Sequence, residues 1–310
     1  MKTQHIKNCE IKVPKSNAFA IETAEHLPKL HCNMLFVAKR GSGKSVKMVN
    51  MLRMLKETGS MDRIFVVSPT FNSNKMLLKQ LDVEEEDVFA DPDDENVVQE
   101  IIDAVDSERE DYERYHDQMK QYKKFMKLLH SSKFDIPDEM LLEFYDEGEF
   151  KPPEHRWKGR KPTLGLIVDD CQSTKIFRSR KFLNLVTRHR HLGQFKEGGA
   201  LGLSLFICIQ NFTASGGGCP RAVRNNATHM VVFRTKDQKE LQQIAESCSG
   251  EIDIDTFYQV HEFAMCNGGE YPSLFIDLHK KDHHPSGFRI NYDTFIIPEK
   301  IKDECKKNNV

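Results

Sequence analysis

The sequence predicts an α/β fold with a mostly parallel sheet flanked by helices. Short apolar runs alternate with segments in which apolar residues recur at helical spacing. The runs are continuously apolar, as in parallel strands that are covered on both faces. The first run ends in a glycine-rich turn that leads into a helix. A chain of 310 residues suits one such core with an insertion, so we expect a single domain over 1–310 with an insertion over 82–150.

The first predicted elements are a strand over 34–38 and the helix that follows it. The strand (MLFVA) leads into a polar glycine turn over 39–43 (KRGSG), and apolar residues then recur at helical spacing over 46–55. A second strand is expected over 63–68 (RIFVVS), and a proline follows it.

The insertion over 82–150 is marked by its charge. Residues 82–114 hold 16 acidic and two basic side chains, a net charge of −14. The whole chain carries −2, so the remainder carries −2 − (−14) = +12. Residues 112–130 then mix charged and apolar residues at helical spacing, which predicts an exposed helix.

The second half returns to the strand–helix alternation. We expect strands over 163–168, 201–209, 230–233 and 273–278, and helices over 176–192, 237–247 and 253–265. The segment 172–196 contains seven Lys or Arg residues and no acid, which is compatible with a nucleic-acid partner and equally with a solvated helix face.

Several classes of protein are disfavoured by composition. The eight cysteines are scattered without a CxxC pair, which argues for reduced thiols rather than a disulfide framework or a zinc ribbon. The most apolar stretch, 202–209, is too short to span a bilayer, and the first fifteen residues lack the apolar core of a signal peptide. We therefore expect no membrane partner.

The turn after the first strand fits the template of a phosphate-binding loop. Residues 38–45 (AKRGSGKS) match it except that Ala38 replaces the first glycine. In such loops backbone N–H groups surround the phosphates, the lysine (Lys44) contacts the β- and γ-phosphates, and the hydroxyl (Ser45) coordinates Mg²⁺. The expected nucleotide-binding residues are Lys39, Arg40, Gly41, Ser42, Gly43, Lys44, Ser45 and Val46.

Two later strands end in polar residues that suit ATP hydrolysis. Asp169 directly follows the strand LGLIV and is the expected second Mg²⁺ ligand beside Ser45. Asp170 follows it, in the place of a residue that orients the attacking water. Gln210 ends the next apolar strand, and its amide would face the γ-phosphate if that strand lay between the strands that carry Lys44 and Asp169.

Together the motifs AKRGSGKS, LIVDDC, RHRHLG, LFICIQ and PRAVRNNATHMVVFRTKD resemble the poxvirus-type genome-packaging ATPases of large double-stranded DNA viruses, within the FtsK–HerA superfamily. The resemblance covers about 30–80 and 160–280. It implies a RecA-like P-loop core with an additional strand, and a homo-oligomeric ring, a pentamer or a hexamer. ATP and Mg²⁺ would bind between subunits, double-stranded DNA would pass through the ring, and a capsid or portal protein would hold it.

The resemblance also assigns roles to residues. It places the phosphate lysine, the magnesium acid and the polar sensor on Lys44, Asp169 and Gln210, and Asp170 stands where the superfamily has its catalytic glutamate. Ring ATPases supply an arginine to the neighbouring site, and we expect Arg224 in that role, with Arg221 as the second candidate.

The resulting expectation is an ATP-driven DNA translocase that packages a viral genome, in the host cytoplasm at the virus factory or in association with the virion. Two alternatives share the same site. One is another P-loop DNA-dependent ATPase, such as a helicase or a recombinase-like enzyme. The other is an assembly protein that binds nucleotide without hydrolysing it.

Overall fold

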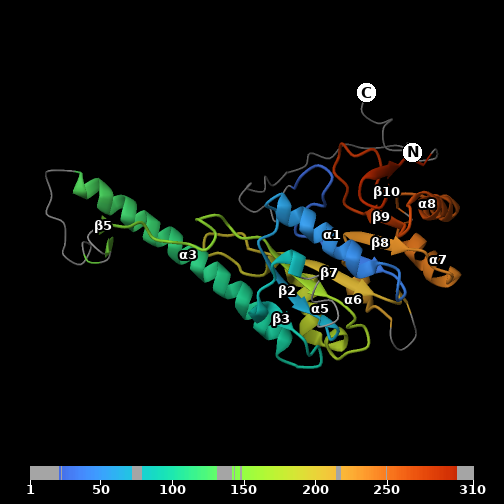
Figure 1. Cartoon of the computed structure of the whole chain (residues 1–310), viewed down its shortest axis with the longest axis horizontal. Coiled ribbons are helices and arrows are strands. Elements are labelled where there is room, and N and C mark those ends of the chain that lie inside the picture. The colour runs from blue at the N-terminus through green and yellow to red at the C-terminus, as the bar shows by residue number, and fades with distance from the viewer. Residues whose placement is uncertain are drawn as a thin grey trace, which may run out of the picture.

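The computed structural model of the chain is built around one nine-stranded sheet, whose order is β11-β10-β9-β8-β1-β7-β6-β2-β3 (Figure 1). The structure describes residues 21, 23–71, 79–130, 142, 144–146, 149–213, 218–248 and 250–298, and only the backbone of residues 146 and 149. The strands from β8 to β3 are mutually parallel, and β9, β10 and β11 add an antiparallel edge.

The strands of this sheet are β1 (Asn33–Val37), β2 (Arg63–Val67), β3 (Val88–Phe89), β6 (Leu164–Val168), β7 (Leu203–Ile209), β8 (His229–Phe233), β9 (Ser273–Asp277), β10 (Phe288–Ile290) and β11 (Thr294–Ile296). The helices are α1 (Lys44–Glu57), α3 (Val97–Leu129), α5 (Arg180–Arg188), α6 (Arg221–Asn225), α7 (Gln238–Ser247) and α8 (Ile254–Asn267). Short 3₁₀ turns occur at η2 (Lys79–Leu81), η3 (Glu85–Asp87), η4 (Ile176–Arg178) and η5 (His189–His191), and a separate hairpin joins β4 (Tyr145–Asp146) to β5 (Glu149–Phe150).

The predicted α/β fold is confirmed, including the position of the strand that ends at Gln210. That strand, β7, pairs with β1 on one side and with β6 on the other. The strand that leads into the phosphate loop and the strand that leads to Asp169 are therefore separated by the additional strand, as the resemblance implied.

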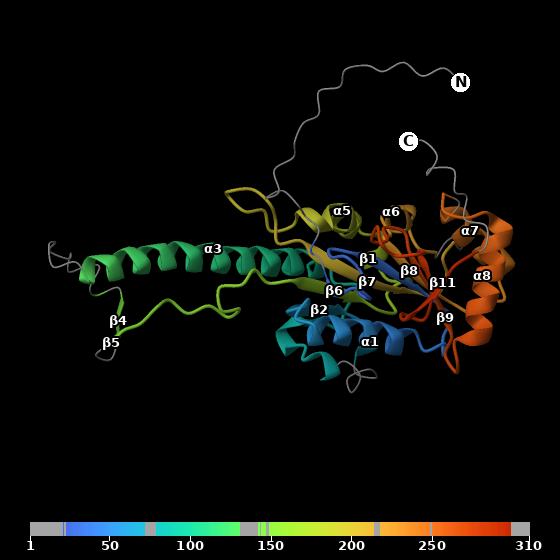
Figure 2. The ribbon, with the colours of Figure 1, turned by 90° about the horizontal axis from the view of Figure 1, so that it is seen from above.

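Both faces of the sheet are covered, which explains the continuously apolar strands. Alternate residues of β1 face opposite sides: Met34 and Phe36 pack in a cluster with α1, whereas Leu35 and Val37 pack in the cluster that includes α3, α5 and α7. Figure 2 shows α1 on one side of the sheet and α5 and α6 on the other. The burial of both faces fixes the strand register.

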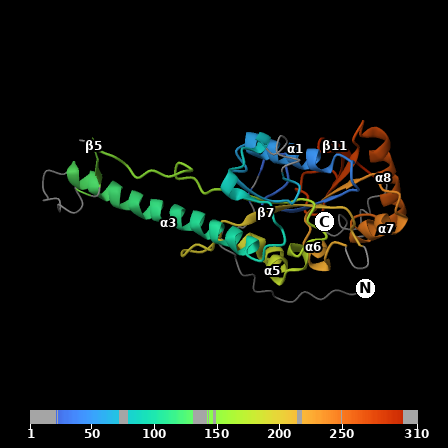
Figure 3. The same cartoon turned by 60° about the horizontal axis from the view of Figure 1, so that its bottom comes forward.

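The acidic region 82–150 divides into a part that joins the core and a part that leaves it. Residues of β3 pair in parallel with β2, and Val97, Ile101 and Val105 of α3 are buried against the sheet. The rest of α3 extends away from the sheet as an arm, with β4 and β5 beside its far end (Figures 2 and 3). The prediction of an exposed helix thus describes the distal part of α3.

The arm has its own small aromatic core. Phe125 is fully buried, and its ring centroid lies 4.9 Å from that of Phe150 and 5.4 Å from that of Phe144. Tyr122 packs against Phe144 at 5.3 Å. These contacts hold the chain that returns from the tip against α3, so the arm is a packed unit joined to the sheet through the first turns of α3.

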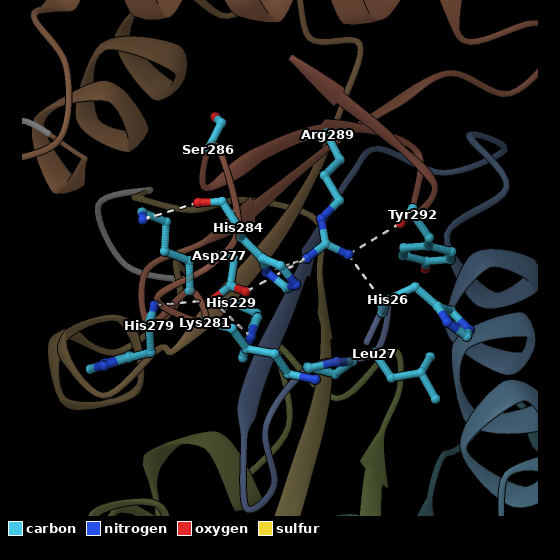
Figure 4. Close-up of polar contacts among 12 residues, drawn as sticks. His26, Leu27, His229, Asp277, His279, Lys281, His284, Ser286, Arg289 and Tyr292 are labelled. Atoms are coloured by element: carbon cyan, nitrogen blue, oxygen red, sulfur yellow. Dashed lines mark hydrogen bonds and ion pairs between the residues drawn. The ribbon is translucent and has the colours of Figure 1, made fainter. Parts of the chain in front are cut away.

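A buried polar cluster fastens the antiparallel edge to the segment before β1 (Figure 4). The Arg289 guanidinium donates hydrogen bonds to the carbonyls of His26 at 2.8 Å and Tyr292 at 3.3 Å. His229 Nε2 lies 3.1 Å from Asp277 Oδ1, and Asp277 Oδ2 lies 4.0 Å from Arg289. Because His229 begins β8, this cluster lies at the end of the sheet opposite the phosphate loop. Its contacts hold the antiparallel strands and the segment before β1 together.

In the part of the chain that the structure describes, none of the helices has the length and apolar content needed to cross a membrane.

Candidate nucleotide-binding site

The phosphate loop connects β1 to α1 and contains two left-handed glycines. Gly41 has φ 80° and Gly43 has φ 84°, conformations that glycine adopts without steric cost. Ser42 Oγ donates a hydrogen bond to the carbonyl of Lys39 at 2.7 Å, which closes the turn. The N-terminus of α1 follows directly, so its free backbone N–H groups are available to an anion.

Ala38, the departure from the loop template, continues the strand. Its N–H donates to the carbonyl of Ile209 at 3.0 Å. Among the described residues, the non-glycine positions with positive φ are Asp82, Lys158, Asp170 and Asn291. Ala38 therefore needs no left-handed backbone, and alanine is accommodated there without strain.

Lys44 and the paired aspartates converge at the carboxyl edge of the sheet. Lys44 Nζ lies 3.5 Å from Asp170 Oδ1 and 3.8 Å from Asp169 Oδ1. The Lys44 side chain is 8% exposed and that of Asp169 is 4% exposed. Buried charges are costly unless they are paired, so each group holds the others in position.

Ser45 and Asp169 form an oxygen pair that fits Mg²⁺. Ser45 Oγ donates to Asp169 Oδ2 at 2.9 Å, and Asp169 Oδ1 is buried without a hydrogen-bond partner among the described residues. Burial raises the pKa of Asp169, and the charge of Lys44 opposes that rise. Hydroxyl and carboxylate oxygens are the ligands of hard cations, so the donor set suits the predicted ion.

Asp170 differs from Asp169 in its exposure and its partners. Its backbone is left-handed, with φ 55°, and its side chain is 33% exposed. Its Oδ1 accepts from Gln210 Nε2 at 3.3 Å, and its Oδ2 accepts from Thr70 Oγ1 at 3.3 Å. These contacts orient a carboxylate that is open to solvent at the mouth of the site.

Gln210 is itself held by a residue that the motifs did not single out. Gln172 Oε1 accepts from the backbone N–H of Gln210 at 2.7 Å and of Asn211 at 3.1 Å. Asn211 Oδ1 in turn accepts from Lys39 Nζ at 2.5 Å. This network ties the end of β7 to the phosphate loop. Gln172 and Thr70 follow apolar strands, as Gln210 does, and that was the signal in the sequence that could have found them.

A second residue missed by the sequence motifs is Tyr271, in the loop between α8 and β9. Its ring lies against Gly43, because a Cβ atom at Gly43 would approach Tyr271 Cδ1 to 3.1 Å. Tyr271 remains 50% exposed, as does Val46 in the first turn of α1. Only the fold brings position 271 to the phosphate loop, so spacing in the sequence carried no signal of it.

Arg224 is not part of this cluster within one chain. It lies in α6, and its guanidinium carbon lies 5.2 Å from the centroid of the Phe212 ring. Its Nε is buried without a hydrogen-bond partner among the described residues. Arg221 is exposed at the start of the same helix. Neither residue contacts Lys44, Asp169 or Asp170 among the described contacts, so action on the same site within the chain is not seen.

The basic segment 172–196 lies on the face of the sheet opposite α1. It forms η4, α5 and η5, and its seven basic side chains are all exposed: Lys175, Arg178, Arg180, Lys181, Arg188, Arg190 and Lys196. The intervening apolar residues Phe182, Leu185 and Val186 are buried in the core. The segment therefore presents exposed basic side chains on a packed helix, with acidic residues beside them: Asp93, Asp94 and Glu95 line a pocket with Lys175, Arg178 and Arg180, and Lys196 Nζ lies 4.0 Å from Glu113 Oε2.

No protein-family model and no curated protein matches the sequence. Solved structures resemble the chain at low identity. The DNA-packaging ATPase B204 from Sulfolobus turreted icosahedral virus has 13% identity and a TM-score of 0.47, over 86% of this chain and 98% of that chain. The B204 genome-packaging NTPase from Sulfolobus turreted icosahedral virus 2, in complex with ATP-γ-S, has 14% identity and a TM-score of 0.42 over the same shares.

EssC ATPases 2 and 3 from Geobacillus thermodenitrificans have 14% identity and a TM-score of 0.39, over 74% of this chain and 40% of that chain. A viral genome-packaging ATPase, the class that the sequence motifs resemble, is thus among the structures that this chain is similar to. The strand order and the geometry of the phosphate loop define the fold. By those features, the chain has the α/β fold of a P-loop ATPase.

Proposed function

We propose that the chain is a Mg²⁺-dependent ATPase. The observation that carries this proposal is the convergence of Lys44, Asp169 and Asp170 at the end of a phosphate loop, with Lys44 Nζ within 3.8 Å of both carboxylates. A glycine turn with only a structural role would not need a buried lysine. It would also not need two aspartates from the end of a different strand beside that lysine.

In this proposal each group acts on one part of the triphosphate. The N–H groups of the loop and Lys44 bind the β- and γ-phosphates, and Ser45 and Asp169 hold Mg²⁺, which when bound neutralises phosphate charge. Asp170 orients the attacking water and accepts its proton. Gln210, which contacts Asp170, links the state of that carboxylate to β7 and, through Gln172, to the start of the basic segment.

We further propose that the ATPase acts on double-stranded DNA as a ring that packages a viral genome. The exposed basic segment 172–196 supports a phosphate-contacting surface, which would be independent of sequence and sensitive to salt. The motif resemblance supports a ring of subunits and a capsid or portal protein as its partner. We propose that the ring acts in the host cytoplasm or in association with the virion. Arg224, whose Nε has no hydrogen-bond partner in the described part of the chain, remains our candidate for an arginine that acts across a subunit interface.

The test is ATP hydrolysis measured against protein concentration, with and without double-stranded DNA. We expect turnover per subunit to rise with concentration and with DNA, and the K44A variant to lose it. Hydrolysis that does not depend on concentration would contradict the ring. Strand displacement on a forked duplex would favour the helicase alternative.

A non-catalytic role gives a different result in the same assay. Tight, Mg²⁺-dependent ATP binding without turnover at any DNA or protein concentration would reject the ATPase and favour an assembly protein. Mixing R224A subunits with wild-type subunits tests the interface arginine, because an arginine that acts on a neighbour lowers the turnover of the mixture below the average of its components.

A further inference from the structure

The loop between α8 and β9 places an aromatic ring at the phosphate loop. Tyr271 lies against Gly43, and an added Cβ at that glycine would stand 3.1–3.5 Å from three atoms of the tyrosine side chain. Yet the tyrosine is 50% exposed. A large aromatic side chain in this position is supported on one side and open on the other.

The position of Tyr271 is fixed by the loop around it. A Cβ at Gly268 would stand 2.6 Å from Pro272 Cβ, and Gly269 has φ 77°, so the five-residue turn is tight and needs its glycines. The carbonyl of Gly268 accepts from Asn291 Nδ2 at 3.2 Å. The turn after β10 therefore holds the loop in place.

The same turn is bound to the first turns of α1. Asn291 Oδ1 accepts from Lys47 Nζ at 2.7 Å, and Tyr292 Oη donates to the carbonyl of Lys47 at 2.8 Å. A continuous set of contacts thus links Tyr271 to the helix that begins with Lys44 and Ser45. The ring is preorganised beside the loop, which reduces the entropy that a bound ligand would have to overcome.

We propose that Tyr271 forms the base subsite of the nucleotide site. The nucleotide base stacks on the exposed face of the Tyr271 ring while the phosphate loop holds the triphosphate. Every nucleobase has a π-face, and stacking on an aromatic side chain contributes about 1–3 kcal/mol per base with little preference among bases. Val46, in the first turn of α1, is an apolar side chain that is also 50% exposed.

The Asn291 side chain, which holds the loop of Tyr271, is already engaged in hydrogen bonds. Asn291 Oδ1 accepts from Lys47 and from Ser273, and its Nδ2 donates to Gly268. Lys47 Nζ uses one of its three N–H donors in that contact. Base edges are told apart by unengaged donors and acceptors. Because stacking has little preference among bases, we infer that the site accepts nucleoside triphosphates without selecting adenine.

This inference rests on the proposed nucleotide site and adds a base subsite to it. The test compares binding of Mg·ATP, Mg·GTP and inorganic tripolyphosphate, a probe that has the phosphates and no base. We expect wild-type dissociation constants for ATP and GTP within about threefold of each other. Y271A should raise both by about tenfold, the equivalent of roughly 1.4 kcal/mol of lost stacking.

Tripolyphosphate separates this subsite from the phosphate loop. Y271A should leave its affinity within about twofold of wild type, whereas Y271F should bind all three ligands as wild type does, because the ring is retained. An unchanged ATP affinity in Y271A, or an equal loss of tripolyphosphate binding, would overturn the proposal of a base subsite at Tyr271. A wild-type preference for ATP over GTP above about thirtyfold would overturn the inference on substrate class.

The proposed ATPase can fail without deciding this question. If the wild type binds nucleotides but does not hydrolyse them, the binding ratios still test Tyr271. If the wild type binds tripolyphosphate as tightly as ATP and GTP, the phosphate-binding site is supported and the base subsite is wrong. If K44A binds all three ligands as tightly as the wild type, the proposed nucleotide site is wrong, and the base subsite is wrong with it. Thermal unfolding of Y271A serves as the check on its fold.

Discussion

The carboxyl edge of the sheet and the distal part of α3 differ in the burial and pairing of their charged side chains. At the edge, Lys44 and Asp169 are almost fully buried and lie within 3.8 Å of each other. On the distal helix, residues 118–130 carry four lysines and no acid, and Lys123, Lys124 and Lys127 are exposed with no described partner. The buried charges are fixed by one another, and such fixed geometry suits catalysis. The exposed charges are solvated and separately movable, which suits contacts with a charged partner.

Of the substitutions that compare the two regions, the largest effect is expected at Asp170, which lies beside Lys44 at the carboxyl edge of the sheet. D170N keeps the size of the side chain and removes its basicity, so turnover should fall by about 10²–10⁴-fold. The affinity for ATP should change far less. Single-turnover hydrolysis and nucleotide binding, measured on the same preparation, check this prediction. K124Q on the arm is the matched control with one charge removed, and a comparable loss of turnover there would erase the distinction between the two regions.

The same aromatic truncation should give different results in the two regions. Phe206 of β7 and Phe125 of α3 are both fully buried. F206A opens a cavity in the main core and should lower the free energy of unfolding by about 3–5 kcal/mol. F125A should loosen the arm while the main unfolding transition and nucleotide binding stay close to wild type, because Phe125 contacts only the arm's aromatic residues among its described ring partners.

Hydrogen exchange locates each of these effects. For F125A, protection should be lost in α3 beyond residue 112 and retained in β1 and β7. A global loss of protection in F125A would show that the arm is part of the folding unit.

Much of the fold and of the candidate site could be predicted from the sequence, because most residues of the buried parallel strands are apolar and several polar site residues come at or soon after a strand end. Asp169, Asp170 and Gln210 all stand at such strand ends, and parallel pairing brings those ends to one edge. Tyr271 could not be found this way. It reaches Gly43 only through the packing of two loops that are distant in sequence.

The acidic region shows a second limit, one of composition. Val97, Ile101 and Val105 pack on the sheet, but carboxylates separate them along the chain. A net charge of −14 over residues 82–114 therefore obscures four buried apolar residues of α3, namely Val97, Val98, Ile101 and Val105. Periodicity predicted a helix only over 112–130, whereas α3 begins at Val97, within the acidic part of the region.

A smaller effect is expected at the two basic surfaces. Replacing Arg180, Lys181 and Arg188 with alanine should weaken DNA binding and reduce its salt dependence by up to about three in slope, since each phosphate contact releases a counterion. The alanine triple variant at Lys123, Lys124 and Lys127 is the matched comparison. Titration of a labelled duplex at several salt concentrations checks it, and an equal loss for both variants would show that the arm contacts DNA as well.

The smallest effect is on pH dependence. Burial lowers the pKa of His31 to about 3 and of His189 to about 4. In the unfolded chain both titrate near 6.5, so the unfolded state binds more protons below that pH and stability falls as the pH is lowered from about 6.5 towards 4. H189N should make the melting temperature fall less steeply over this range. H130N, at the exposed end of α3, should leave the slope unchanged, and the reverse pattern would contradict the assignment.

The most direct test of the account is a double-mutant cycle between Lys44 and Asp169 on the binding of Mg·ATP. If both groups act on one bound magnesium–triphosphate, the effects of K44A and D169N are not additive, and the coupling energy exceeds about 0.5 kcal/mol. Strictly additive effects, or binding that neither variant weakens, would show that the two side chains do not serve one nucleotide.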